Sequence, residues 1–256
     1  MKYQLGKNAP RHLESTIALT DHLDMVTGWP IVAAQGWEYA PVPITLDMLG
    51  NDTVGDCVIA AAMHYAQVET ANTGNPLTPT KDLALQTYSA ITGYDPNDPN
   101  TDQGTDFESQ LFPYWQSKGI PLLDSKGNTV LHTIEGFAAL DLTSIAQQRW
   151  ANKTFGGVLM GFQCPSAIVG NLTNWNDPSG PTAGGHGVNI VGQGSMGWNL
   201  DSWGARIPGT WNFSRTLADE MYCVVTKLWL DAQGVTPSGC NLNGLLAAMN
   251  AVKAAA

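Results

Sequence analysis

The residues Asn51-Asp52-Thr53-Val54-Gly55-Asp56-Cys57-Val58-Ile59-Ala60-Ala61-Ala62 join a turn-prone polar segment to an apolar, helix-forming one. Alanines favour a helix that begins near Cys57, and Thr73-Gly74-Asn75-Pro76 would end it, so we expect a helix over residues 57–72. A thiol in the first turn lies at the positive end of the helix dipole, which favours the thiolate. Cys57 is therefore a candidate nucleophile, although free cysteines are also often small buried core residues.

Two segments far downstream could complete a catalytic site around Cys57. His186 starts an apolar run that predicts a strand, and Asp201 follows one hairpin later, in Asn199-Leu200-Asp201-Ser202-Trp203-Gly204. An imidazole near a thiol can form a thiolate–imidazolium pair, and a carboxylate can accept the far ring N–H and fix the tautomer. Taken singly, His186 would be interpreted as a structural histidine in a strand and Asp201 as an ordinary acidic residue of a turn. Their combination with Cys57 favours a catalytic role.

Three more residues have both a functional and a structural interpretation. The amide of Asn51 could join the Cys57 backbone N–H in stabilising an oxyanion, or it could serve the turn chemistry of Gly50-Asn51-Asp52. Trp203 could cover the histidine and carboxylate and exclude water, or be a core aromatic. His64 lies two turns along the helix, about 10 Å from Cys57 at 1.5 Å per residue, which is too far for a base.

The order of the predicted elements changes half-way along the chain. We expect helices over residues 57–72, 80–92, 105–118, 142–153 and 242–256, and strands over residues 130–134, 156–162, 186–191, 196–201 and 221–230. Residues 163–185 form a long loop that would suit a cleft wall. The layout predicts an α+β fold with an extended arm at 1–44, a helical lobe carrying the cysteine at 45–125, and a β-rich lobe carrying the histidine and aspartate, with a C-terminal helix, at 126–256.

The order and spacing of these residues resemble the papain-like cysteine peptidases. In that family the histidine and its orienting residue follow the cysteine by roughly 130 to 150 residues. Here His186 is 129 residues and Asp201 is 144 residues after Cys57. Gln103-Gly104 is similar to part of the glycine wall of the family's substrate cleft, and the strand at 155–162 is similar to a family strand in the right order. The resemblance covers about residues 45–230 and implies a substrate cleft between the two lobes, with Gly104 and Trp203 as substrate-binding residues.

The chain departs from the family pattern at four positions. Asn51 replaces glutamine, Asp56 replaces serine, Val58 replaces an aromatic residue, and Asp201 replaces asparagine. An aspartate in the last place also occurs in the peptidase domains that cleave bacteriocin leaders, so the resemblance implies a workable Cys-His-Asp triad. The arm at 1–44 is too short and too rich in proline to match the inhibitory propeptide of many relatives, and we expect it to wrap the domain.

Composition excludes several classes of function. The net charge of −10 argues against binding to a phosphate backbone, and no apolar run approaches a membrane span. The four cysteines form no CxxC pair, and no phosphate-loop or metal-protease motif occurs, so we expect neither a metal nor a cofactor. No signal-peptide core is visible, and the compartment and the oligomeric state are not indicated.

The leading hypothesis is a papain-like cysteine hydrolase. It would cleave a peptide or isopeptide bond of a peptide or protein substrate through a thioester on Cys57. Two alternatives stay open at this point. Interception of the thioester by an amine would make the protein an acyl or peptidyl transferase or ligase. The substitutions at Asn51, Asp56 and Val58 would also suit a catalytically silent binding module on the same fold.

Overall fold

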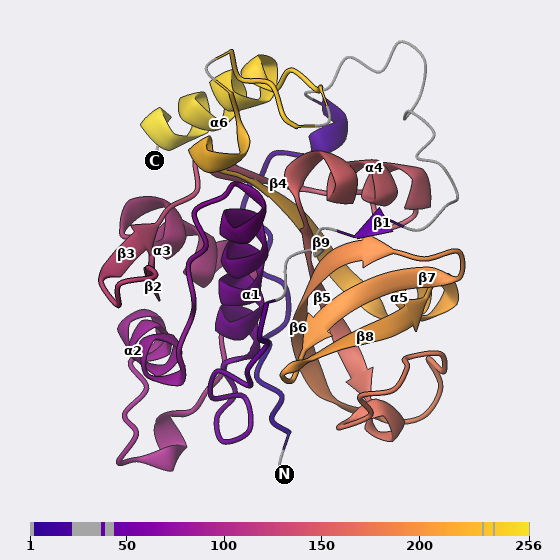
Figure 1. Cartoon of the computed structure of the whole chain (residues 1–256). Coiled ribbons are helices and arrows are strands. Elements are labelled where there is room, and N and C mark those ends of the chain that lie inside the picture. Colours follow the sequence, from indigo (N-terminus) through magenta and orange to yellow (C-terminus); the bar gives the residue numbers. More distant parts are fainter. Residues whose placement is uncertain (1–2, 22–36, 39–43, 232, 238, 256) are drawn as a thin grey trace.

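The computed structural model describes residues 3–21, 37–38, 44–231, 233–237 and 239–255. Figure 1 shows a helical lobe and a sheet lobe on either side of an extended N-terminal segment. The first lobe holds α1 (Cys57–Asn72), α2 (Lys81–Thr92), α3 (Phe112–Ser117) and the hairpin of β2 (Ile120–Leu123) and β3 (Thr129–His132). Each lobe has its own cluster of buried apolar side chains. The predicted α+β class, with a helical lobe followed by an antiparallel sheet, is confirmed.

Helix α1 is buried on all sides, because its small and apolar side chains let both lobes pack against it. The helix begins at Cys57 and ends at Asn72, as predicted. Fourteen of its residues are buried, from Cys57 through Thr70. A helix that is apolar all round belongs inside a protein rather than on its surface. Gly187 of the sheet lobe approaches Val58, and a Cβ added to that glycine would lie 3.2 Å from the valine side chain.

The sheet lobe is a seven-stranded antiparallel sheet. Its main path runs β4 (Gly136–Ala139), β9 (Ala218–Val225), β5 (Val158–Pro165), β6 (Thr182–Gln193), β7 (Gly197–Ser202) and β8 (Ala205–Thr210), and β1 (Trp37–Glu38) pairs with β6. Three helices, α4 (Ile145–Phe155), α5 (Trp211–Leu217) and α6 (Asn243–Ala255), belong to this part of the chain. In the register, His186 is opposite Phe162, and Ile190 is opposite Leu200.

Several predicted elements differ from the structure in bounds or type. The helix expected over 105–118 is a single π-helical turn at Phe107–Leu111 followed by α3, because Asp106 caps the Ser109 N–H and delays the start. The strand expected over 221–230 begins at Ala218 and ends at Val225, after which Thr226 caps a 3-10 turn. The loop expected over 163–185 is shorter, since β5 and β6 extend into it.

The described start of the arm, residues 3–21, runs between the two lobes and contacts both. In Figure 1 it is the indigo chain beside α1 and β6. Lys7 forms a parallel bridge with Thr105 of the helical lobe, and its backbone N–H donates to the Gly185 carbonyl of β6 at 3.1 Å. Further on, Ala18 bridges Ala139 of β4. Most of the rest of the arm expected over 1–44 lies outside the described residues.

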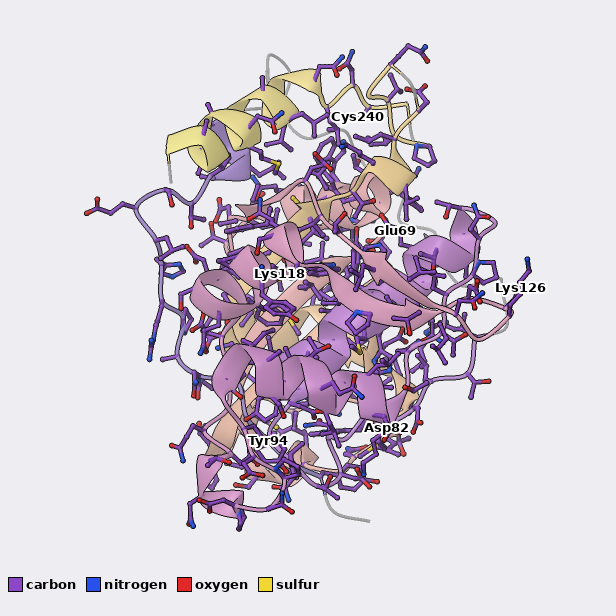
Figure 2. The ribbon with its side chains drawn as sticks, turned by 90° about the vertical axis from the view of Figure 1, so that its left-hand side faces the viewer. Glu69, Asp82, Tyr94, Lys118, Lys126 and Cys240 are labelled. Atoms are coloured by element: carbon purple, nitrogen blue, oxygen red, sulfur yellow. The ribbon has the colours of Figure 1, made fainter. Side chains whose placement is uncertain are left out.

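The side view in Figure 2 shows the face of the helical lobe, with Lys126 in the turn of the β2–β3 hairpin and Asp82 near the start of α2. Among the residues that the structure describes, no helix is long and apolar enough to span a membrane.

Candidate active site

Cys57 is the first residue of α1, and its side chain is only 1% exposed. The backbone N–H of Gly187, the residue after His186, is near the thiol and acts to lower its pKa. Burial raises the pKa of the Cys57 thiol to about 11, although the N–H groups of Gly187 and Gly6 oppose the rise. The helix terminus alone therefore does not produce a thiolate in this arrangement.

His186 lies on β6 among aromatic side chains. Its ring stacks on Trp203 with centroids 4.4 Å apart and packs edge-on against Phe162 and Trp175. Burial lowers the pKa of His186 to about 3, so the imidazole is neutral at pH 7. One ring nitrogen, Nε2, lies 2.8 Å from the Ser202 hydroxyl, and the other, Nδ1, is buried with no hydrogen-bond partner.

The structure places Ser202, not Asp201, at the far nitrogen of His186. The Asp201 carboxylate instead forms an ion pair with Arg206 of β8, at 2.8 Å from its Nε. The cause is strand geometry, because successive side chains point to opposite faces of a sheet. Ser202 lies on the same face of β7 as Leu200. Leu200 pairs with Ile190, which shares a face of β6 with His186, whereas Asp201 pairs with Asn189 on the opposite face.

That alternation is the signal that sequence analysis missed. The predicted hairpin places His186 on the face of Val188 and Ile190, which belong to the buried sheet core together with Leu200. Side chains two residues apart share a face, so Ser202 belongs beside that core. The spacing that pointed to Asp201 does not take this alternation into account, and the alternation brings Ser202 to Nε2.

Trp203 lies where the sequence predicted a cover for the histidine. Its backbone has a φ of 49°, in the left-handed region that is uncommon for a bulky residue. The ring contacts His186 by stacking and meets Tyr3 of the arm edge-on at 5.3 Å. Trp203 thus lies between the imidazole and the arm. Its role in binding a substrate stays a prediction.

Asn51 and Asp56 support the turn that leads into α1. The Asn51 amide donates to the Val54 carbonyl at 3.2 Å, which is the turn chemistry considered above. Its role towards an oxyanion stays a prediction. Asp56 is fully buried, and this burial raises the pKa of its carboxyl well above the usual value. The Asp56 charge that would oppose a thiolate is correspondingly reduced.

The arm covers the thiol at Gly6. We call residues 3–8 the covering segment. The Gly6 N–H is near the Cys57 sulfur and acts to lower the pKa of the thiol, and the Gly6 carbonyl accepts from the Thr105 N–H at 2.9 Å. A Cβ added to Gly6 would overlap the Gly55 carbonyl, and one added to Gly104 would overlap the Gly6 carbonyl. The predicted cleft residue Gly104 is therefore in contact with a peptide segment.

The covering segment lies over the thiol with its Leu5–Gly6 peptide, whose N–H is on the side of the sulfur. A groove of about 270 Å³ continues along this segment, and it is lined by Leu5, Gly6, Lys7, Asn8, Asp102, Gln103, Gly104 and Gly185.

The remaining cysteines and His64 contribute no second site. Cys164 and Cys223 are buried, Cys240 is half-buried, and all four cysteines are free thiols. His64 is buried with its Nε2 3.1 Å from the Asp47 carbonyl, consistent with the structural role predicted for it. Within the described ranges, no group of three or more histidine, cysteine, aspartate or glutamate side chains could hold a metal ion.

Comparison with solved structures decides the fold. Xylellain, a cysteine protease from Xylella fastidiosa, superposes with a TM-score of 0.62 over 88% of this chain and 97% of its own, at 15% sequence identity. The chain has the papain-like fold. A cysteine protease of Carica candamarcensis, CMS1MS2, matches with a TM-score of 0.55 over 75% of this chain and 98% of its own, at 13% identity.

A third papain-like structure, procathepsin B from Trypanosoma congolense, covers 87% of this chain and 87% of its own with a TM-score of 0.56, at 12% identity. No protein-family model and no curated protein matches the sequence. The papain-like fold is therefore shared at a level of sequence similarity that leaves the chemistry to be argued from the side chains.

Proposed function

We infer that the protein is a papain-like thiol hydrolase that cleaves a peptide or isopeptide bond. Cys57 is the nucleophile in this proposal, and His186 is its base. The observation that carries it is the Nδ1 atom of His186, which is buried without a hydrogen-bond partner on the residue next to Gly187, whose backbone N–H is near the Cys57 sulfur. A ring nitrogen that accepts no other proton is available as a base.

The proposed reaction follows from the two ring nitrogens of His186. Nδ1 takes the thiol proton, the sulfur attacks the carbonyl carbon, and the new C–S bond leaves a negative charge on the carbonyl oxygen. The Cys57 backbone N–H, at the start of α1, is one donor for that oxygen, and Asn51 is the candidate for a second. The imidazolium then gives its proton to the leaving amine as the C–N bond breaks. Water, activated by the same base, hydrolyses the thioester.

Ser202 is the positioning residue in this proposal. For Nδ1 to accept the thiol proton, Nε2 must carry the other proton and donate it to the Ser202 hydroxyl. Asp201 acts less directly, by holding Arg206 and so fixing β7 against β8. The proposed machinery is thus Cys57, His186 and Ser202.

The covering segment makes the proposed enzyme latent. With the segment in place, the thiol and the imidazole are both neutral, since burial shifts the pKa of each group in the direction that favours its uncharged form. Removal of the segment admits water and lowers the cost of forming the thiolate–imidazolium pair. The reactivity of Cys57 is therefore expected to depend on whether the segment is bound.

The experiment that tests this function measures the rate of Cys57 alkylation by iodoacetamide at a series of pH values from about 5 to about 10. This range includes the ordinary pKa of a thiol. Gly6→Ala forces the covering segment away, because its Cβ would overlap the Gly55 carbonyl. We expect slow labelling of the unaltered protein and fast labelling of G6A, with a plateau below pH 7. Adding His186→Ala to G6A should remove that plateau.

Gly194→Ala is the matched control, because no atom lies within 4 Å of a Cβ added there. It should label as slowly as the unaltered protein. The hydrolase would be excluded, and a binding module favoured, if G6A gave a single rise near the ordinary thiol pKa that His186→Ala left unchanged.

A further inference from the structure

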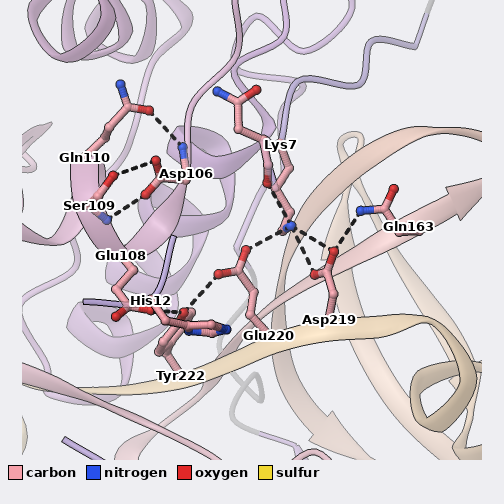
Figure 3. A network of polar contacts seen from close by, with 11 residues as sticks. Lys7, His12, Asp106, Glu108, Ser109, Gln110, Gln163, Asp219, Glu220 and Tyr222 are labelled. Atoms are coloured by element: carbon pink, nitrogen blue, oxygen red, sulfur yellow. Dashed lines mark hydrogen bonds and ion pairs between the residues drawn. The ribbon is translucent and has the colours of Figure 1, made fainter. Parts of the chain in front are cut away.

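The side chain of Lys7 fills a largely buried acidic pocket next to the proposed nucleophile. Its ammonium group lies 3.0 Å from an oxygen of Asp219 and 3.0 Å from an oxygen of Glu220, both on β9. The lysine side chain is fully buried, as is nearly all of Glu220. Figure 3 shows the lysine nitrogen at the centre of this network. A buried cation between two carboxylates occupies a site that is built for its charge.

The pocket has walls that the sheet lobe supplies by itself. Gln163 of β5 donates to Asp219 at 2.8 Å, and the Tyr222 hydroxyl oxygen lies 3.0 Å from a Glu220 oxygen (Figure 3). The same hydroxyl lies 2.6 Å from Glu108, which joins the network to the helical lobe. Glu108 also contacts His12, Leu13 and Thr16 of the arm. The contacts of Gln163 with Asp219 and of Tyr222 with Glu220 do not involve the arm, so we expect both carboxylates to keep their positions when the covering segment leaves.

Gly161 sets the shape of the pocket. A Cβ added at this position would overlap Cε of Lys7 and would lie 2.5 Å from a Glu220 oxygen. The missing side chain therefore leaves room for the methylene stem of the lysine. The pocket is long enough for a four-carbon chain and has its negative charge at the end.

The position of this pocket links it to the proposed chemistry. Gly6 contacts the Cys57 sulfur, and Lys7 is the next residue, with its N–H on the Gly185 carbonyl beside His186. A peptide that replaces the covering segment would have a side chain at the mouth of the same pocket. After Lys7 leaves, two neighbouring carboxylates have lost their cation, and a cationic side chain would restore the balance.

We propose that Asp219, Glu220 and Gly161 form a specificity pocket for a long basic side chain, that of lysine, in the peptide substrate. This inference rests on the proposed function, since it names the substrate class of the same site. Lys7 then has two effects in the covering segment: it anchors the segment and it occupies the pocket that a substrate needs.

The test uses the full chain with Lys7→Met, which removes the charge at similar side-chain length. The probes are two pools of fluorescent octapeptides with degenerate flanking positions, one with a fixed lysine and the other with norleucine in its place. Binding is measured on K7M combined with Cys57→Ala, and turnover on K7M alone. We expect the lysine pool to bind at least about tenfold more tightly, the ratio expected for about 1.4 kcal/mol from a partly buried ion pair.

Three further variants locate the preference. Glu220→Gln and Asp219→Asn should each reduce the lysine-to-norleucine ratio, and Asp82→Asn, on an exposed part of α2, should not. Gly161→Ala fills the pocket without changing a charge and should weaken lysine binding as well. Unaltered near-ultraviolet circular dichroism would show that each variant is folded.

The outcomes separate this inference from the proposed function. Preferential binding of the lysine pool without turnover would support the pocket and argue against the hydrolase. Turnover of both pools at equal rates would overturn the pocket and leave the hydrolase standing. Equal binding of the two pools, or binding of neither, would also overturn the pocket.

Discussion

Ser202 and Asp201 are neighbours with different partners, and this difference can be measured. In the G6A background, where the thiol is expected to be exposed, Ser202→Ala removes the oxygen 2.8 Å from His186 Nε2. We expect the plateau rate of Cys57 alkylation below pH 7 to fall by about tenfold or more, because an unoriented imidazole is a poorer base. The measurement is the pH–rate profile, which a purely structural effect would not change in shape.

Asp201→Asn is the matched comparison, since it keeps the size of the side chain and weakens the ion pair with Arg206. It should lower stability and leave the shape of the pH profile as it is. The opposite pattern, with a changed profile in D201N and an unchanged one in S202A, would restore Asp201 as the orienting residue.

The candidate nucleophile and base could be predicted from sequence because each has a local signal. Cys57 follows a polar turn and opens an alanine-rich helix, and His186 lies between glycines at an apolar strand. Ser202 has no such signal, since its importance depends on which face of β7 meets the buried face of β6. The contacts of Gly6 and Lys7 depend on tertiary structure alone, because residues 3–8 have no periodic pattern.

At the scale of elements, helices and strands with a strong local sequence pattern could be predicted, whereas strands at the edge of a sheet could not. Helix α1 has the predicted bounds because its small apolar residues suit a buried helix and the following Gly74 and Pro76 end it. Strands β2 and β8 were not predicted, and each contains a proline, Pro121 and Pro208, which argues against a strand in sequence. Strand β8 lies at the end of the sheet path, where a missing N–H is tolerated.

The covering segment should dissociate more readily in acid. Burial raises the pKa of Glu220 above its usual value, although Lys7 and the Tyr222 hydroxyl oppose the rise. As the pH falls through this raised pKa, the carboxylate takes a proton and Lys7 loses one of two ion-pair partners, Asp219 being the other. Lys7 lowers the pKa of Glu220, so loss of Lys7 from an otherwise unchanged pocket raises this pKa further, and proton uptake therefore favours the released state. Glu108 also faces this group through Tyr222.

Hydrogen exchange at the Lys7 and Asn8 amides measures this release, because both N–H groups are bonded across the cleft. After correction for intrinsic exchange, we expect protection to fall by about tenfold from pH 7 to pH 5, for a loss of about 1.4 kcal/mol. Glu220→Gln should show the low protection at both pH values. Glu14→Gln, on an exposed part of the arm, is the control, and a fall that persists in E220Q would contradict the mechanism.

At the scale of the whole molecule, a buried polar network joins the two lobes away from the site. The Trp115 indole N–H of α3 donates to His132 Nδ1 at 3.1 Å, so the proton of this imidazole lies on Nε2. Nε2 donates to Glu69 of α1 at 2.6 Å, and the Thr226 hydroxyl, just after β9, donates to the same carboxylate. One glutamate thus connects α1 with elements of both lobes.

Glu69→Ala should destabilise the whole protein rather than the site. The substitution leaves His132 Nε2–H and the Thr226 hydroxyl buried without an acceptor, at about 1–3 kcal/mol each. In urea unfolding, this loss of stability should lower the midpoint concentration of urea, and both lobes should unfold in one transition.

Glu135→Ala removes a surface ion pair with the exposed Lys227 at 3.4 Å and should cost about 1 kcal/mol or less. If E69A were no less stable than E135A, the network would not hold the lobes together. Unfolding of E69A in two transitions would show instead that Glu69 couples the unfolding of the two lobes.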